Sequence, residues 1–141
     1  MAIEPPALPF AVQRIVYFAL IMSMVCYAVV PAVVLQQNGG KGLAEVPLPM
    51  LDTVAITLGA VLGVAAIFVR GKLHTVAAAQ AGAARARALF RATLVPLAMI
   101  EAGCLLGLTA WMMNGNPVPG LVVALVLLSL AILIVPLRDP A

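Results

Sequence analysis

Charged residues are scarce in this sequence. Lys, Arg, Asp and Glu together make up 9% of the 141 residues, whereas 65% are apolar and the mean hydropathy is +1.17. A soluble domain usually has about 25% charged residues. The composition therefore argues against an ordinary soluble domain and predicts an integral membrane protein.

Residues that build metal centres and active sites are equally few. The chain has one His and two Cys, and Cys26 and Cys104 lie in different apolar runs without metal-ligand spacing. We find no phosphate loop, dinucleotide fingerprint or nucleophile motif. The methionines are interpreted as packing residues. We therefore expect no catalytic residue, metal or cofactor, and the chain is not predicted to be an enzyme.

Four long apolar runs divide the chain, at about residues 15–35, 51–69, 92–113 and 121–137. A hydrocarbon core about 30 Å thick needs about 20 residues of helix to span it. The runs lack the alternation of polar and apolar residues that barrel strands show. The predicted fold class is an all-α integral membrane protein with four transmembrane helices, in one membrane domain of residues 1–141.

Basic residues are concentrated in the connection between the second and third runs, which contains Arg70, Lys72, Arg85, Arg87 and Arg91. Lys and Arg in short loops stay on the cytoplasmic side of a membrane. This connection and both termini are therefore expected to be cytoplasmic, in a bacterial inner (plasma) membrane. The same five residues are an expected contact for anionic lipid. Nucleic-acid binding is not expected, because aromatic residues are not interleaved with the basic ones.

The basic connection is also rich in Ala, the best helix former. The second and third spans are therefore expected to continue as helices beyond the bilayer and to reverse near Gly82, which makes residues 51–113 one long helical hairpin. His74 in this connection is interpreted as an ordinary solvated side chain rather than a proton carrier.

Each span of this hairpin contains a G-x-x-x-G motif, Gly59/Gly63 in the second and Gly103/Gly107 in the third. Such motifs remove side-chain bulk from one helix face and let backbones approach closely. The two pairs lie at similar depths, so an antiparallel hairpin is expected to bring them together. The alternative is that Gly is simply common in membrane helices.

One carboxylate, Glu101, lies near the middle of the third run. An ionised carboxylate at that depth costs about 3 kcal/mol or more, and no basic residue lies at the middle of any run. The expected partners are backbone carbonyls, water, or the hydroxyl groups of Tyr17, Ser23, Tyr27, Thr53, Thr57, Thr93, Thr109 and Ser129. Such a site suits proton or cation exchange. The alternative is a protonated Glu that only hydrogen-bonds a neighbouring helix.

The segment RATLVPLAMIEAGCLLGLTAWMM, residues 91–113, resembles the carboxylate helix of the proteolipid (c-type) subunits of rotary ATP synthases. The matching positions are Arg91, Thr93, Leu94, Ala98, Glu101, Ala102, Gly107 and Leu108. The resemblance implies that Glu101 corresponds to the proton- or sodium-binding carboxylate of that family. The chain differs from the family in its sparser glycines and in the absence of a duplicated hairpin.

These observations favour a small, proteolipid-like membrane subunit of a larger homo- or hetero-oligomeric complex, which handles protons or cations through Glu101. A purely structural accessory subunit without a transport role is the main alternative. A small four-helix exporter is less favoured, because such exporters use a Glu in the first span and this first span has none.

Overall fold

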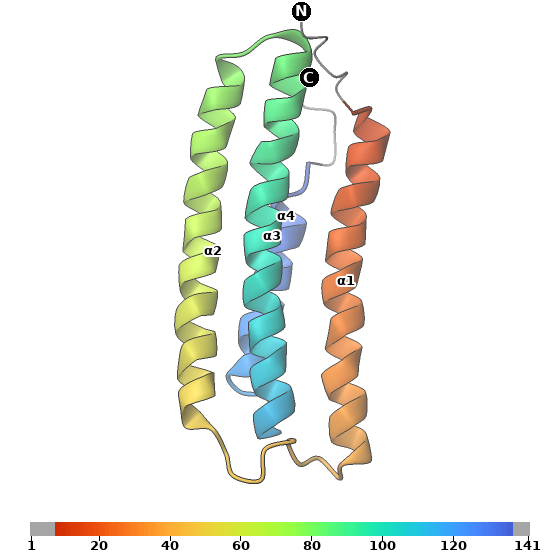
Figure 1. The fold of residues 1–141 in the computed structure, drawn as a ribbon, viewed down its shortest axis with the longest axis vertical. Coiled ribbons are helices and arrows are strands. Elements are labelled where there is room, and N and C mark those ends of the chain that lie inside the picture. Colours follow the sequence, from red (N-terminus) through yellow and green to blue (C-terminus); the bar gives the residue numbers. More distant parts are fainter. Residues whose placement is uncertain (1–7, 137–141) are drawn as a thin grey trace, which may run out of the picture.

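The computed structural model describes residues 8–136 as a bundle of four α-helices that run alternately up and down (Figure 1). They are α1 (Phe10–Gln37), α2 (Pro49–Ala78), α3 (Gly82–Asn114) and α4 (Gly120–Ile134). No strand occurs among the described residues. The prediction of an all-α fold is confirmed.

Three of the helices, α1, α2 and α3, are long and apolar enough to cross a membrane. Helix α4 has only 15 residues, which at 1.5 Å per residue is about 22 Å and less than a hydrocarbon core of about 30 Å. The predicted fourth apolar run continues to residue 137, which lies outside the described residues. The helix ends earlier because Val135 precedes Pro136, and a residue before proline is driven toward extended backbone; Val135 has φ −74° and ψ 125°.

Helices α2 and α3 form a long antiparallel hairpin. Both continue well past the apolar runs, as the Ala-rich connection predicts, and only residues 79–81 separate them. Gly82 starts α3 with φ +58°, a left-handed conformation that glycine adopts without steric cost. We call the end of the bundle that contains residues 79–81 the turn end, and the opposite end the loop end.

Helix α3 is the centre of the bundle. It lies between α1 and α2, which do not contact each other within the described residues, and α4 packs behind it (Figure 1). Half of the apolar window of α3 is buried, compared with 17% for α1 and 22% for α2. The other three helices are therefore held mainly by their contacts with α3.

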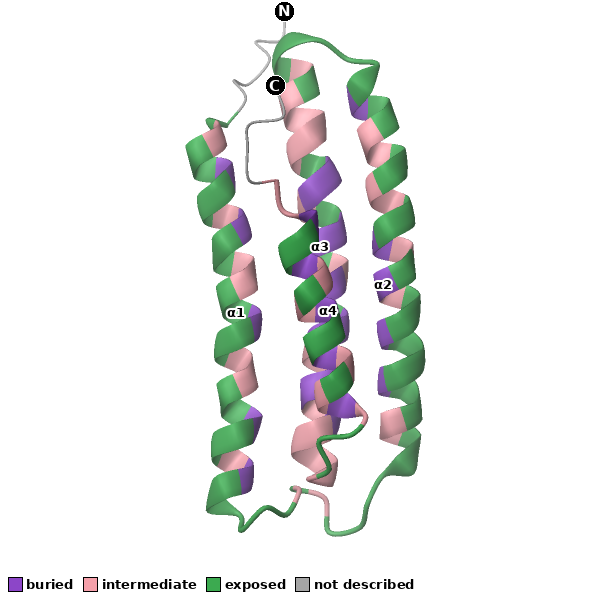
Figure 2. Cartoon of the chain, turned by 180° about the vertical axis from the view of Figure 1, so that it is seen from behind, coloured by how far each residue is buried: buried purple, intermediate pink, exposed green. Residues whose placement is uncertain are grey.

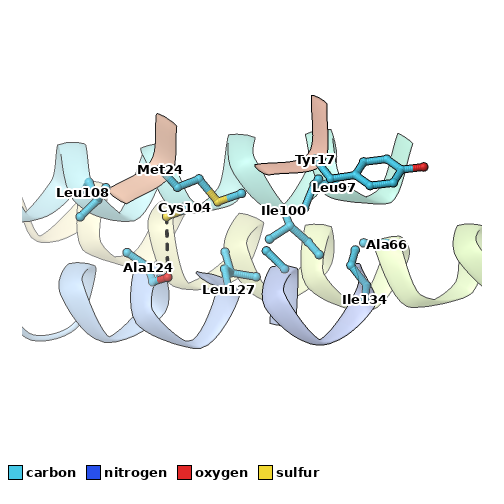
Figure 3. Close-up of a cluster of buried hydrophobic side chains, with 11 residues drawn as sticks. Tyr17, Met24, Ala66, Leu97, Ile100, Cys104, Leu108, Ala124, Leu127 and Ile134 are labelled. Carbon is cyan, nitrogen blue, oxygen red and sulfur yellow. Dashed lines mark hydrogen bonds between the residues drawn. The ribbon is translucent and has the colours of Figure 1, made fainter. Parts of the chain in front are cut away.

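The buried core lies along α3 and between α3 and α4 (Figure 3). Its largest members on α3 are Leu97, Ile100 and Leu108, and α1 adds Tyr17 and Met24. From α4 come Ala124, Leu127, Ala131 and Ile134. Because α4 packs on one side of α3 and α1 on another, the core occupies only part of the bundle's cross-section.

The outward faces of the helices are apolar as well as exposed (Figure 2). On α1, Ile15 is 67% exposed and Phe18 65%, and on α2, Phe68 is 69% exposed. An exposed apolar surface of this extent is typical of contact with lipid or with other helices, not with water. This exposed apolar surface agrees with the presence of three helices that are long and apolar enough to cross a membrane.

At the loop end, the segment that joins α1 to α2 is attached to the end of α3. The backbone N–H groups of Leu43 and Ala44 donate hydrogen bonds to the carbonyls of Met112 (3.1 Å) and Met113 (2.9 Å). The Asn114 side chain accepts from Leu48 N–H (2.9 Å) and donates to Leu48 O (3.1 Å). The bonds from Leu43 and Ala44 satisfy carbonyls that the last turn of α3 would leave without partners.

Candidate ion-binding site

The Glu101 carboxylate lies on the side of α3 that faces α1. Glu101 Oε1 is hydrogen-bonded to the hydroxyl of Ser23. The same hydroxyl is 2.9 Å from the carbonyl oxygen of Leu20, one turn earlier on α1. The pair joins residues from the first and third helices of the bundle, so its formation depends on how α1 is rotated and positioned along α3.

The Ser23 hydroxyl lies within reach of two acceptors, Glu101 Oε1 and Leu20 O. A hydroxyl carries one proton and can donate it to only one acceptor at a time. When Glu101 is protonated, it can donate to Ser23 Oγ while Ser23 donates to Leu20 O, and both contacts are hydrogen bonds. When Glu101 is ionised, Ser23 can donate to the carboxylate only by leaving Leu20 O. The direction of the hydrogen bond between Ser23 and Glu101 therefore depends on where the proton lies.

The pair opens toward the outside of the bundle. Glu101 is half-buried, and Ser23 is exposed on α1. Next to Glu101 on α3, Ala98 and Ala102 are exposed too. Because no Lys, Arg or His occurs in residues 15–37 or 92–136, these segments of α1, α3 and α4 offer the carboxylate no cation.

Four of the other hydroxyls that the sequence offered to Glu101 bond the backbone of their own helices. Thr109 donates to Leu105 O (2.8 Å) and Ser129 donates to Leu125 O (2.8 Å), each within its own helix. Thr53 and Thr93 bond their own helices in the same way. Tyr17 packs in the core against Phe90, with ring centroids 5.7 Å apart. The structure thus brings Ser23 to Glu101 from the eight candidates.

The two glycine pairs lie on another side of α3 from Glu101. Gly103 follows Glu101 by two residues, which rotates it by about 200° around the helix. A Cβ added to Gly103 would lie 3.5 Å from Gly59 Cα and 2.7 Å from Leu127 Cδ1 of α4. Helices α2 and α3 therefore approach closely at Gly59 and Gly103, and α4 packs into the space beside them.

The second glycine of each pair also contacts α4. A Cβ added to Gly107 would lie 2.7 Å from the carbonyl oxygen of Gly120, and one added to Gly63 would lie 3.1 Å from Leu127 Cδ2. Close by, the Cys104 thiol donates to Ala124 O over 3.7 Å (Figure 3). The small residues of the hairpin are thus a packing surface for α4 and are separate from the carboxylate.

Metal chemistry receives no support from the described residues. Residues 8–136 contain no group of three or more His, Cys, Asp or Glu that could hold a metal ion. Cys26 is exposed on α1 and Cys104 is buried between α3 and α4, so the two thiols lie in different surroundings. The candidate site consists of the Glu101 carboxylate and the Ser23 hydroxyl.

Comparison of the chain with protein-family models, curated proteins and solved structures found no match. Any assignment of function therefore depends on the geometry of the site. The likeness of residues 91–113 to the c-type subunits stays an expectation from the sequence.

Proposed function

We propose that this protein is a small integral membrane subunit of a larger complex and that Glu101 and Ser23 together bind and release a proton. The observation that carries the proposal is the hydrogen bond between these two side chains on neighbouring membrane-length helices. Each residue lies near the middle of its helix, about 20 Å along the axis from the loop end. Both groups would therefore lie well inside a hydrocarbon core about 30 Å thick.

The cost of charge at this depth explains why a hydroxyl is useful. An ionised carboxylate in hydrocarbon is unfavourable by about 3 kcal/mol or more unless it gains hydrogen bonds or a counter-charge. Ser23 can accept from the protonated carboxyl, and by rotating its hydroxyl away from Leu20 O it can donate to the ionised carboxylate. The pair thus has a hydrogen-bonded arrangement for each protonation state, as a group that exchanges protons requires.

A single proton-binding pair does not make a transport pathway. Movement of a proton across a membrane needs access to the carboxylate from both sides, and this chain has no other carboxylate between residues 53 and 136. Ser23 is exposed and Glu101 is half-buried at the seam between α1 and α3, so a neighbouring subunit can contact the pair there. The wide exposed apolar surface of α1 and α2 also supports a homo- or hetero-oligomeric assembly, because other helices can pack against it.

A second function is favoured by the position of α1. This helix contacts α3 and, to a smaller extent, α4, and leaves most of its surface exposed. The bond from Ser23 to Glu101 is a polar link that fastens α1 to the bundle. Interhelical hydrogen bonds of this kind contribute about 0.6 to 2 kcal/mol. In a purely structural subunit, that attachment would be the role of Glu101.

The proposed topology follows the distribution of charge. With the turn end on the cytoplasmic side of a bacterial inner membrane, the basic residues of the α2–α3 connection obey the positive-inside rule. Helix α4 then runs from the loop end toward the cytoplasmic side.

Carbodiimide modification tests the proposal directly. A hydrophobic carbodiimide reacts with a protonated carboxyl that it can reach from the lipid, so we expect it to modify Glu101 of the detergent-solubilised protein in preference to Glu45 in the exposed loop. Modification is measured by peptide mass spectrometry as a function of pH. It should decline as rising pH ionises Glu101.

Glu101→Gln separates the two functions. The amide keeps the shape and can still donate to Ser23, so the variant should fold and retain its co-purifying subunits in both cases. Slow, pH-independent modification of Glu101 together with an active Gln variant of the complex would leave only the structural role. Rapid, pH-dependent modification with an assembled but inactive Gln variant supports proton handling.

A further inference from the structure

An apolar groove of about 360 Å³ runs along the seam between α2 and α4. The two helices contact each other on the side of the bundle that Figure 2 shows. Gly59 and Gly63 of α2 line the groove without adding side-chain bulk, and every other residue that lines it is apolar. Val64 is 56% exposed and Val126 62% exposed at its walls, so the groove opens to the outside of the bundle.

Two buried nitrogen atoms without partners follow this groove toward the turn end. Arg70 Nε and His74 Nε2 have no hydrogen-bond partner in the part of the chain that the structure describes. Arg70 comes three residues and His74 seven residues after Ile67, which lines the groove, so the three side chains share one face of α2. A buried polar atom without a partner costs free energy. The two nitrogens therefore favour a ligand that forms hydrogen bonds with them.

We propose that this seam binds one anionic phospholipid, with an acyl chain in the groove between α2 and α4 and with the phosphate held by Arg70 and His74. The inference concerns a different side of the bundle from the Glu101 site and does not depend on proton exchange.

Helix α4 ends at the level of Arg70. Gly63 of α2 lies against Leu127 of α4, since a Cβ added to Gly63 would lie 3.1 Å from Leu127 Cδ2. Arg70 and Ile134 are each seven residues further toward the turn end, which is about 10 Å along their helices. The wall that α4 gives to the groove therefore ends where the basic side chains of α2 begin, which is the arrangement that an acyl chain with an attached headgroup requires.

The depth of the two basic residues fits a lipid phosphate. Counted from Pro49 at the loop end of α2, Arg70 is about 32 Å and His74 about 38 Å along the helix axis. A hydrocarbon core of about 30 Å is followed by a polar headgroup layer of about 5 to 7 Å. When the loop end of α2 lies at one boundary of the core, Arg70 falls within the opposite headgroup layer and His74 at its outer edge.

The described helices place no carboxylate next to Arg70. Asp52 lies at the other end of α2, about 27 Å away along the axis. The only Asp or Glu in residues 53–136 is Glu101, which is bonded to Ser23 on the side of α3 that faces α1. An arginine binds a phosphate through paired hydrogen bonds, and a histidine ring nitrogen can donate another. An anionic headgroup is therefore the matching ligand.

The groove favours a lipid over a soluble phosphate. From Arg70 it leads toward the loop end past Ile67 and Val64, at depths that hydrocarbon occupies. An acyl chain joined to the headgroup would pack along this groove, where the glycines let it approach the backbone of α2. A soluble phosphate would contact only the basic side chains and gain nothing from the groove. Both Arg70 and His74 are partly exposed, so a headgroup can reach them from the lipid.

Lipid titration of the full-length protein in a mild detergent tests this site. Phosphatidylglycerol and phosphatidylcholine are the two probes, and bound lipid is measured by native mass spectrometry, with thermal unfolding as a second readout. One arginine in the headgroup layer predicts an affinity for phosphatidylglycerol about fivefold above that for phosphatidylcholine. Glycerol 3-phosphate, which has the phosphate without acyl chains, is expected not to compete.

Two matched pairs of variants locate the site. Arg70→Gln should remove the preference for phosphatidylglycerol. Lys72→Gln removes the same charge at nearly the same depth, but from an exposed position about 200° around α2, and should retain the preference. Ala60→Phe keeps every charge and fills the groove, so it should weaken the binding of both lipids. Val61→Phe adds the same bulk at an exposed position outside the groove and should not.

Four results would overturn the proposal. Equal binding of the two lipids by the unmodified protein would show that no anionic site exists. Equal losses in Arg70→Gln and Lys72→Gln would mean that diffuse positive charge attracts the lipid. Full competition by glycerol 3-phosphate would identify a site for a soluble phosphate. Unchanged binding in Ala60→Phe would exclude the groove, and this variant tests the site even if Arg70→Gln fails to fold.

Discussion

The Ser23 hydroxyl of α1 is hydrogen-bonded to Glu101 Oε1 of α3, and this bond joins residues 78 positions apart in the sequence. Ser23 is exposed and Glu101 half-buried, so the bond lies at the outer edge of the helix seam. It is also a polar contact between two helices whose other contacts are largely apolar. The removal of one hydroxyl should therefore have a measurable effect.

Ser23→Ala is expected to lower the free energy of unfolding in detergent by about 1 kcal/mol, because Glu101 loses its partner on α1. The control is Ser129→Ala, since Ser129 bonds only its own helix at Leu125 O. Thermal unfolding of the two variants measures the difference. A loss no greater than that of Ser129→Ala would show that the bond from Ser23 to Glu101 does not hold α1 in place.

Gly103→Leu should disturb the packing of three helices. Its side chain would meet Leu127 of α4 and the backbone of Gly59, and overpacking of this kind costs about 1 to 3 kcal/mol. Gly71→Leu is the control, because a Cβ at Gly71 meets nothing within 4 Å. Gly115 is unsuitable as a control, since its φ of +73° would strain any other residue. If the two variants unfold at the same temperature, close approach at Gly103 is not needed.

Asn114→Ala should loosen the loop end. The substitution removes two hydrogen bonds to the backbone of Leu48, at 2.9 and 3.1 Å, and each contributes about 1 kcal/mol. We expect faster proteolysis within residues 38–48 and a lower unfolding temperature. Asn116→Ala removes only a local bond to Val118 N–H and serves as the control. An unchanged cleavage rate in Asn114→Ala would assign the attachment to the backbone bonds of Leu43 and Ala44 instead.

The proposed orientation is tested by cysteine labelling in intact cells. In a Cys26→Ser background, Gln80→Cys at the turn end should be protected from an impermeant thiol reagent, because this end is proposed to be cytoplasmic. Asn116→Cys at the loop end should react. Cys104 is buried and gives little background. The reverse labelling pattern would invert the topology.

Local features of the chain were sufficient to predict the helices. The length of each apolar run, the Ala-rich connection and the turn at Gly82 act over a few residues, and the structure has three membrane-length helices and a hairpin that reverses at this point. Helix α4 ends at Ile134, before the end of the predicted fourth run, and the cause is also local. Pro136 disfavours helical backbone at Val135.

The sequence by itself determined that a carboxylate lies in a membrane-length helix, and it offered hydroxyls, backbone carbonyls or water as the partner. Only the tertiary structure selected Ser23 and placed α4 against the glycines of the hairpin. The physical reason is that helix formation depends on neighbouring residues, whereas the rotation and register of one helix against another depend on packing between side chains far apart in the chain.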